Sequence, residues 1–272
     1  MIDFKRGTSV KSCCAGFYEL PIVSMLLGNN LHPGGPALTR KLAGAAAIGR
    51  NTKVLDVACG RGESDRVLAA HCGCQVVGVD YSTVNIARAG ELTQDANLDG
   101  RVRFLAGDAE RLPLDDESVD VVIAECSLCT FPHMALALAE VRRVLRPGGR
   151  VGISDVVLNA PVPESLHDLI GHVLCITGAR STQGYHQTLQ DAGFAAIRTR
   201  DVGYVLTEML TRIERRMDTL GDLVESEQFA KVEGLHDAGP KLAEARDFVA
   251  SGSIGYALFT GRNPRTESAR HT

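Results

Sequence analysis

The stretch ValLeuAspValAlaCysGlyArgGlyGlu, residues 54–63, decides the fold of this 272-residue chain. Its apolar start is typical of a buried strand, and it leads directly into a segment of helical length. Gly60 and Gly62 let the backbone approach a ligand at the carboxyl edge of a sheet, where the next helix amino terminus adds a positive field. The following strand ends in Asp80, twenty-four residues after Asp56. We therefore predict that the Asp80 carboxylate accepts hydrogen bonds from a ribose diol.

Outward from this stretch, short β-branched runs alternate with amphipathic segments from residue 53 onward. This alternation predicts an α/β fold with a doubly wound, mostly parallel seven-stranded sheet covered by helices on both faces. We expect strands near 53–58, 75–80, 102–107, 119–125, 150–155, 194–203 and 254–261. We expect helices near 16–28, 36–47, 63–72, 82–95, 134–145, 164–176, 182–192, 205–232 and 239–250, the fifth ended by ProGlyGly at 147–149.

Four regions follow from this pattern. We expect an N-terminal helical arm or lid at 1–50, a core at 51–203, helical segments with a final strand at 204–262, and a disordered polar tail at 263–272.

Composition narrows the partners. The 29 Lys and Arg residues against 33 Asp and Glu give a net charge of −4, without a basic stretch, so no nucleic-acid partner is expected. No apolar run approaches the ~20 residues of a membrane span, and the polar opening 1–6 lacks the apolar core of a secretory signal. We therefore expect a cytoplasmic protein with no membrane partner, whose eight cysteines remain thiols.

A nicotinamide-binding fold would explain Gly60, Gly62 and Asp80 almost as well. Three further motifs separate the two possibilities: GlyValAspTyrSer at 78–82, GlyAspAlaGluArgLeuPro at 107–113 and LeuArgProGlyGlyArg at 145–150. With the first stretch they fall in order over residues 53–155, and together they resemble the class I S-adenosylmethionine-dependent methyltransferases.

The resemblance implies S-adenosyl-L-methionine as cofactor and a role for each matching residue. The methionine portion would be surrounded by Asp56, Gly60 and Gly62, the ribose held by Asp80, one adenine face covered by Tyr81, and the adenine edge met by Asp108 and Ala109. Ala58 stands where the family usually has the first glycine of the loop, which would set the loop slightly farther from the ligand.

Cysteines gather near the predicted catalytic edge. Cys126 follows the fourth strand, Cys129 comes three residues later, Cys175 lies in the segment that normally walls the acceptor pocket, and Cys13 and Cys14 lie in the arm. Free cysteines are often simple packing residues, and we expect that role for Cys59, Cys72 and Cys74.

Around these thiols the sequence resembles the arsenite S-adenosylmethionine methyltransferases. The resemblance rests on SerAspVal at 154–156, ValProGlu at 162–164, CysIleThrGlyAla at 175–179 and TyrHisGlnThrLeuGlnAspAlaGlyPhe at 185–194. It implies that Cys126 and Cys175 bind trivalent arsenic as catalytic thiols, with Cys13 and Cys14 as a further pair. Cys129 is an additional candidate ligand.

The chemistry agrees with this implication. Trivalent arsenic is soft and takes three sulfur ligands, which leaves its lone pair free to attack the sulfonium methyl group without a base. The substrate would be a thiol-bound metalloid, and the partner a thiol reductant. Glu125 departs from the family's usual asparagine; we place it at the cofactor site, where its carboxylate would also favour a cationic or protonated acceptor.

Three alternatives stay open. One is methyl transfer to a small organic O, N or S nucleophile, with Glu125 or a histidine assisting deprotonation and the thiols only packing. Another is a non-catalytic thiol binder of metalloids. A structural zinc site using Cys126, Cys129 and two other cysteines is the third, although the paired spacing of a zinc ribbon is absent. His32 is expected to be a turn residue and 212–216 a solvated helix face.

Overall fold

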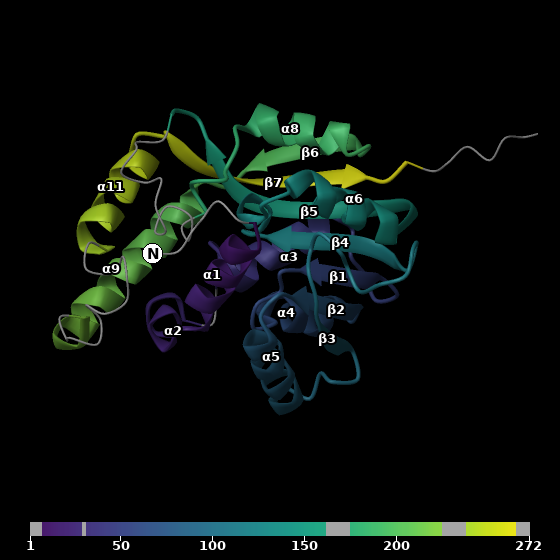
Figure 1. Ribbon diagram of the computed structural model, residues 1–272, viewed down its shortest axis with the longest axis horizontal. Coiled ribbons are helices and arrows are strands. Elements are labelled where there is room, and N and C mark those ends of the chain that lie inside the picture. Colours follow the sequence, from purple (N-terminus) through teal and green to yellow (C-terminus); the bar gives the residue numbers. More distant parts are fainter. Residues whose placement is uncertain (1–6, 29–30, 162–174, 225–237, 265–272) are drawn as a thin grey trace, which may run out of the picture.

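The computed structural model describes residues 7–28, 31–161, 175–224 and 238–264. At its centre is a seven-stranded sheet in the order β3-β2-β1-β4-β5-β7-β6 (Figure 1). The strands are β1 (Lys53–Val57), β2 (Gln75–Asp80), β3 (Val102–Ala106), β4 (Val119–Glu125), β5 (Leu145–Leu158), β6 (Ala195–Asp201) and β7 (Ile254–Arg262). The helices are α1 (Gly7–Glu19), α2 (Pro21–Leu27), α3 (Gly35–Ala45), α4 (Glu63–Cys72), α5 (Thr83–Asp95), the 3₁₀ turn η1 (Leu128–Thr130), α6 (Met134–Val144), α8 (Thr182–Asp191), α9 (Tyr204–Val224) and α11 (Ala238–Ala250).

The sheet confirms the predicted fold class. Strands β1 to β5 pair in parallel, whereas β7 runs antiparallel to both of its neighbours, β5 and β6. The strand order reverses between β1 and β4, and in open α/β sheets ligands bind at the carboxyl ends of the strands beside such a switch. The final strand, predicted near 254–261, is β7, and it lies inside the sheet between β5 and β6, which both precede it in the chain.

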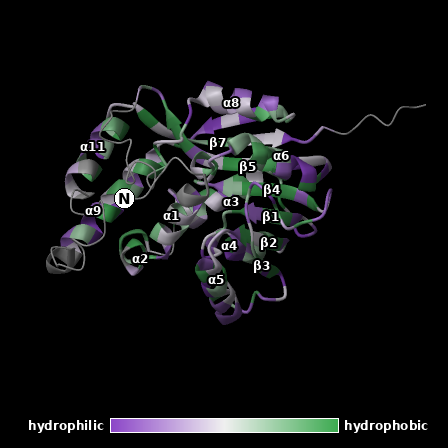
Figure 2. Ribbon diagram, viewed as in Figure 1, coloured by the Kyte–Doolittle hydropathy of each residue, from purple (hydrophilic) through white to green (hydrophobic). Residues whose placement is uncertain are grey.

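Each face of the sheet carries its own hydrophobic core, because successive strand residues point to opposite faces. Val54 packs with the residues of α3 and α4, whereas its neighbour Leu55 packs with those of α6 and α8. Figure 2 shows the hydrophobic residues along the central strands β4 and β5 and more hydrophilic ones on the outer helix α8. Near-continuous apolar strands such as β4 are expected where both faces are covered.

The helices α1, α2, α9 and α11 form a group beside the sheet (Figure 1). Helix α9 contacts α2, α11 and β7, so the two ends of the chain meet there. A small cluster of Leu210, Ile213 and Leu242, with Leu27 packed against it, joins them.

The helix predicted at 16–28 is wrong in its bounds. The structure has α1 up to Glu19 and a separate α2 from Pro21, with Leu20 extended at φ −60° and ψ 133°. Proline disfavours helical geometry in the residue before it, so Leu20 breaks the helix. The helix predicted at 36–47 is α3, and its Leu42 packs beside Gly152 of the sheet.

Two further expectations are corrected near the chain's last strand. The segment 147–149 lies inside β5 and does not follow helix α6 as a loop, because the chain is already extended at Leu145. Asn263, predicted to begin a disordered tail, is buried, and its side-chain Nδ2 donates a hydrogen bond to the Leu145 carbonyl at 3.0 Å. Its backbone N–H donates to the carbonyl of Gly149.

Parts of two predicted helices lie outside the described residues. For the helix expected at 164–176, only residues 175 and 176 are described, and they are not helical. The helix expected at 205–232 is α9, described to Val224.

Candidate active site

A pocket of about 1020 Å³ of empty volume lies at the carboxyl ends of β1, β2, β3 and β4, under helix α1. Most residues predicted to bind the cofactor line it. They are Asp56, Ala58, Gly60, Asp80, Tyr81, Asp108, Ala109 and Glu125. We call it the donor pocket. The sequence thus predicted residues that come together from four separate strand ends.

Gly62 is the predicted residue that does not line the donor pocket. It stands before α4 with φ at 70°, a conformation that glycine adopts without strain. A Cβ there would lie 2.4 Å from the Phe104 ring, so Gly62 lets β3 and α4 pack closely. Ala58 also has a positive φ, at 60°, which is uncommon for a residue with a side chain.

The Asp80 carboxylate is fixed by the backbone around it. Its two oxygens accept hydrogen bonds at 2.8 Å from the N–H groups of Gly60 and Ser82. Burial raises the pKa of Asp80, while these two amide donors oppose that rise. The carboxylate is thereby held rigidly at the edge of the pocket.

Deeper in the pocket, two carboxyl groups are buried side by side. Asp56 on β1 is 2% exposed and Asp65 on α4 is fully buried. Burial and the nearby Asp65 raise the pKa of Asp56 well above its usual value, and burial raises the pKa of Asp65 to about 7. Ionisation of both groups at once is disfavoured, because two buried negative charges near each other repel strongly.

Glu125, at the end of β4, is held in a buried polar network. Its carboxylate accepts hydrogen bonds from the hydroxyls of Ser64 at 2.6 Å and Thr39 at 3.0 Å. The His32 Nε2 lies 3.8 Å from the carboxylate, while its Nδ1 lies 3.0 Å from the Pro33 carbonyl and donates to it. His32 therefore lines the donor pocket and is more than a turn residue.

The donor pocket has an acidic lining. Four carboxyl groups line it, those of Asp56, Asp80, Asp108 and Glu125. Lys11 is the one lysine among the described lining residues, and its ammonium group already pairs with Asp108 at 2.8 Å and with Glu110 at 2.7 Å. Such a pocket suits a cationic ligand and disfavours the diphosphate of a dinucleotide.

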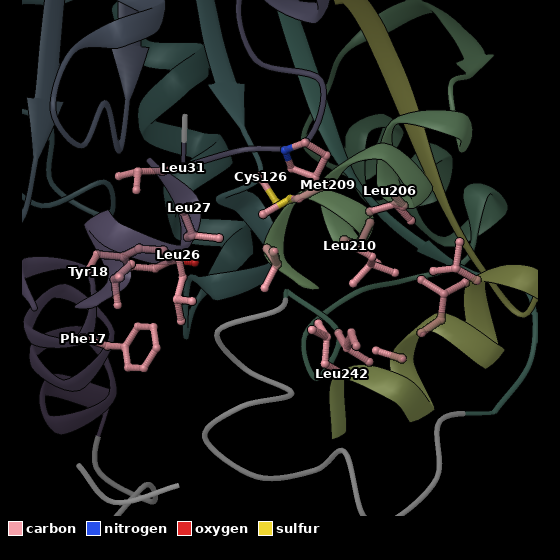
Figure 3. Close-up of a pocket in the computed structure, with 18 of the residues that line it drawn as sticks. Phe17, Tyr18, Leu26, Leu27, Leu31, Cys126, Leu206, Met209, Leu210 and Leu242 are labelled. Atoms are coloured by element: carbon pink, nitrogen blue, oxygen red, sulfur yellow. The ribbon is translucent and has the colours of Figure 1, made fainter. Parts of the chain in front are cut away.

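A second pocket, with an empty volume of about 1100 Å³, opens between the helix pair α1–α2 and the pair α9–α11 (Figure 3). Its lining is almost wholly apolar, and none of the described residues in it carries a charge. The members from the C-terminal helices are Leu206, Met209, Leu210, Ile213, Met217, Leu242, Ala245 and Val249. We call it the acceptor pocket.

The two pockets meet at three residues. Tyr18, Leu31 and Cys126 line both of them. In Figure 3 Tyr18 reaches from α1 toward the interior, and Cys126 lies across the pocket from it. Burial, followed by nearby thiols that include Cys175 and Cys126, raises the pKa of the Tyr18 phenol.

Two of the predicted thiols do come together. The Cys126 and Cys175 Sγ atoms are 3.3 Å apart, and the Cys175 thiol donates a hydrogen bond to the Cys126 carbonyl at 3.2 Å. Donor atoms of Cys126, Cys175 and Asp155 all lie within 4.8 Å of one another. The hydrogen bond to Cys175, together with burial, raises the pKa of Cys126.

A third predicted thiol lies beside this pair. Cys129 is buried on η1, where its thiol is hydrogen-bonded with that of Cys175, and its backbone N–H donates to Asp155 at 3.1 Å. Cys14 is buried and lines the donor pocket, and the side chain of Cys13 lies outside what the structure describes. Cys74 lies in the hydrophobic core with Cys72 packed against it.

Sequence reasoning expected an acceptor pocket beside Cys126 and the segment of Cys175, but it missed Tyr18 and the apolar lining from the helices near both ends of the chain. The apolar lining comes from helices at the two ends of the chain, and an apolar helix face does not reveal which face it will meet. A tyrosine inside such a face carries no spacing signal of its own. For His32, the ProGlyGlyPro that follows it was the available signal, and it pointed to a turn.

The chain matches known methyltransferases. Residues 55–153 match a family described as methyltransferase domain. The 27-O-demethylrifamycin SV methyltransferase of Amycolatopsis mediterranei is 30% identical over 263 residues, which cover 89% of this chain and 93% of that protein. The arsenite methyltransferase of Halobacterium salinarum is 36% identical over 155 residues, 56% of this chain and 39% of that protein.

Solved structures share the fold. The [4+2]-cyclase SpnF has a TM-score of 0.79 at 23% identity, covering 93% of this chain and 96% of its own. Haemonchus contortus phosphoethanolamine N-methyltransferase 2, solved with S-adenosyl-L-methionine, has a TM-score of 0.73 at 21% identity, covering 96% of this chain and 58% of its own. A search of the described helices finds none with the length and apolarity to cross a membrane.

Proposed function

The chain belongs to the S-adenosylmethionine-dependent methyltransferases, and from that premise we propose that it methylates an organic molecule with a mainly apolar surface. The observation that carries the proposal is the acceptor pocket, which adjoins the donor pocket at Cys126. Pockets of this kind bury most of a ligand's surface and bind it mainly through apolar contact. Arsenous acid, the small, uncharged and polar form of arsenite at neutral pH, gains little from so much apolar wall.

We propose that the donor pocket holds S-adenosylmethionine through its acidic groups. Asp80 accepts from the ribose hydroxyls, Tyr81 covers the adenine and Glu125 accepts from the ammonium group. The sulfonium and ammonium charges offset the carboxylates that line the pocket. When bound, the cofactor supplies an activated methyl group, and these residues orient it toward Cys126.

The apolar walls have two tasks in this proposal. They bind the acceptor, and they exclude water from the point where the two pockets meet. A water-free junction keeps the electrostatic interaction between nucleophile and sulfonium strong. Orientation by Tyr18, Leu31 and Cys126 then provides most of the acceleration, since methyl transfer requires an in-line approach.

Methylation of thiol-bound trivalent arsenic is the second candidate. It is favoured by the 3.3 Å separation of the Cys126 and Cys175 sulfurs at the junction. A third sulfur would have to come from Cys14, Cys129, Cys13 or a thiol reductant. Among the described residues, the group whose donor atoms lie close enough together to hold one ion consists of two thiols, Cys126 and Cys175, and one carboxylate, Asp155.

Separate assays with one acceptor for each candidate function distinguish the two. Purified protein is incubated with S-adenosylmethionine and either a naphthol, as a neutral apolar acceptor, or arsenite with glutathione, and S-adenosylhomocysteine and methylated products are measured by mass spectrometry. We expect the methyl ether of the naphthol as product, and no methylated arsenic. Methylated arsenic without ether, lost in Cys126→Ser and in Cys175→Ser, would establish the arsenic activity instead.

A further inference from the structure

Three thiols and one carboxylate meet beside the junction of the two pockets. The Cys126 and Cys175 sulfurs are 3.3 Å apart, and the Asp155 carboxylate belongs with them to a group whose donor atoms all lie within 4.8 Å of one another. The Cys129 thiol is hydrogen-bonded with Cys175 and with Asp155. These four side chains form one cluster, which we call the thiol cluster.

The fold assembles the thiol cluster from separate parts of the chain. Cys126 follows β4, and its backbone N–H donates to the Ser154 carbonyl of β5 at 2.6 Å. Asp155 is the next residue of β5, Cys129 lies on η1, and Cys175 comes from the segment between β5 and α8. Two adjacent strands of the sheet therefore set the positions of the donor atoms.

The Asp155 carboxylate is oriented by the backbone around it. One of its oxygens accepts a hydrogen bond from the N–H of Cys129 at 3.1 Å, and the other accepts from the N–H of Val156 at 2.9 Å. The residue is fully buried. Each carboxylate oxygen has more than one lone pair, so both can keep these bonds and still bind a cation. Outer hydrogen bonds of this kind fix the orientation of metal ligands.

Thiolates together with a carboxylate are ligands that Zn²⁺ accepts. Zinc binds four ligands in a tetrahedron, at about 2.3 Å from sulfur and about 2.0–2.2 Å from oxygen. Two sulfurs on one such ion lie about 3.8 Å apart, so Cys126 and Cys175 need to separate by only about 0.5 Å. Ca²⁺ and Mg²⁺ prefer oxygen ligands. Trivalent arsenic, which takes three sulfurs, would make no use of the carboxylate.

We propose that the thiol cluster is a zinc site with Cys126, Cys129, Cys175 and Asp155 as its four ligands. The thiols bind as thiolates, so each releases its proton to solvent when the ion enters, and no electron is transferred. The ion can enter at the junction, because Cys126 lines both pockets. The site goes beyond the proposed function and does not depend on which acceptor is methylated.

Cobalt reports the ligand set in the full chain. Co²⁺ adopts the same tetrahedral geometry, and sulfur-to-cobalt charge-transfer bands in its absorption spectrum reveal thiolate ligands. We expect reduced, metal-free protein to develop these bands with one equivalent of Co²⁺ and to lose them when Zn²⁺ is added. The displacement should give a zinc dissociation constant below about 1 µM. Cobalt binding without charge-transfer bands would overturn the proposal, because the ion would then lie on other groups.

Single substitutions identify the ligands. Cys129→Ser, Cys175→Ser and Asp155→Asn should each weaken zinc binding by at least ~100-fold, more than the roughly 10–100-fold cost of losing an outer partner. Cys72→Ser is the matched control, because this thiol lies outside the thiol cluster, and zinc affinity should stay that of the unmodified protein. An unchanged affinity in Cys175→Ser or in Asp155→Asn would overturn the assignment.

X-ray absorption at the zinc edge tests the unmodified protein, so its outcome does not depend on whether a variant folds. We expect three sulfurs at about 2.3 Å and one oxygen at about 2.0 Å from the zinc. A shell of nitrogen and oxygen without sulfur, or a shell of four sulfurs without oxygen, would overturn the proposed ligand set.

Zinc should also stabilise the fold, because the site ties η1 and the segment of Cys175 to β5. At a zinc concentration about 100-fold above the dissociation constant, the thermal midpoint should rise by about 5–10 °C. Cys72→Ser should show the same rise, and Cys175→Ser little or none. Equal rises in the two variants would contradict the proposal. Failure of the proposed function looks different, since protein that leaves a naphthol unmethylated would still bind zinc through the thiol cluster.

Discussion

Single residues at the site adopt backbone conformations that their neighbours impose. Cys126 and Cys175 have φ values of 52° and 62°, and Ala58 has 60°, in the left-handed region that residues with side chains usually avoid. Three such residues bordering one site indicate a backbone held by its surroundings. The close approach that fixes the thiol pair is visible at Gly178, three residues after Cys175.

Gly178 permits that approach. A Cβ there would lie 1.8 Å from the Cys129 carbonyl oxygen, so Gly178→Ala must displace η1 or the segment that carries Cys175. We expect a loss of at least ~1–3 kcal/mol in the free energy of unfolding, measured by urea denaturation. In the control Gly90→Ala nothing lies within 4 Å of the added methyl, and the helix α5 should gain about 0.5–1 kcal/mol. Equal effects in the two variants would contradict this assignment.

Asp65 should make the protein less stable as pH rises. Its pKa is about 7 in the folded chain and about 4 when unfolded, so between these values the folded state binds more protons and its stability falls with increasing pH. The loss is complete above about pH 7. Asp65→Asn should reduce the difference in unfolding free energy between pH 5 and pH 8 by at least ~1 kcal/mol. Urea denaturation at both pH values measures this difference, and an unreduced difference would contradict the raised pKa of Asp65.

At the scale of elements, the strand ends of the donor pocket were predictable and the acceptor pocket was not. The glycine loop after β1 and the aspartates after β2 and β3 are local signals, because each is fixed by one strand and the turn that follows it. The start of strand β5 was predicted five residues too late, whereas the end of helix α6 was predicted within one residue. ProGlyGly at 147–149 suggested a loop, but proline and glycine are also compatible with the irregular start of β5, where the pairing register with β4 shifts. The acceptor pocket needs α1, α2, α9 and α11 to meet, and no local signal reports that contact.

Helix α1 closes the donor pocket through contacts at both of its ends. Lys11 pairs with Asp108 and Glu110, and the Glu19 carboxylate accepts from the Ser82 hydroxyl at 2.6 Å. Between these ends lie Cys14 and Tyr18, which line the pocket. Helix α1 therefore covers the donor pocket, and we expect it to open for exchange of ligands.

Removing the first contact should loosen the helix. Lys11→Ala leaves two carboxylates without their cation, so α1 amides should exchange with deuterated solvent about 3- to 10-fold faster, as for a loss of about 1 kcal/mol. Mass spectrometry of peptides covering α1 measures the exchange. Lys41→Ala, which removes a lysine that contacts the exposed ring of Tyr204, serves as the control and should leave α1 unchanged. Unchanged exchange in Lys11→Ala would show that the Lys11 ion pairs do not hold the helix in place.

At the scale of the whole molecule, the sheet depends on its last strand. Strand β7 pairs with β5 over residues Ile254–Arg262, and β6 has its described sheet pairing with β7. β6 is therefore an edge strand, and among the described strands β7 is the one that joins it to the sheet. The position of β7 could not be predicted from its own sequence, because an apolar strand does not specify which neighbours it will join.

A chain that ends at residue 250 should fail to fold cooperatively. It would expose one edge of β5 and leave β6 unpaired, although it retains every residue of the donor pocket. We expect a broad or absent thermal transition by circular dichroism. A chain that ends at Pro264 retains β7 and the buried Asn263, and it should unfold in a single sharp transition. A sharp transition in the shorter chain would mean that β1 to β5 form an independent unit.

If the donor pocket holds S-adenosylmethionine as proposed, the raised pKa of Cys126 would also protect this thiol from methylation by the cofactor. A thiol at the meeting point of the two pockets would be alkylated by the sulfonium in each idle cycle if it were ionised, because the thiolate is the reactive nucleophile. Its hydrogen bond to Cys175 and its burial raise the pKa and keep the sulfur unreactive. In the proposed complex, the contact between the Cys126 and Cys175 sulfurs would therefore keep the protein from methylating its own thiol before an acceptor binds.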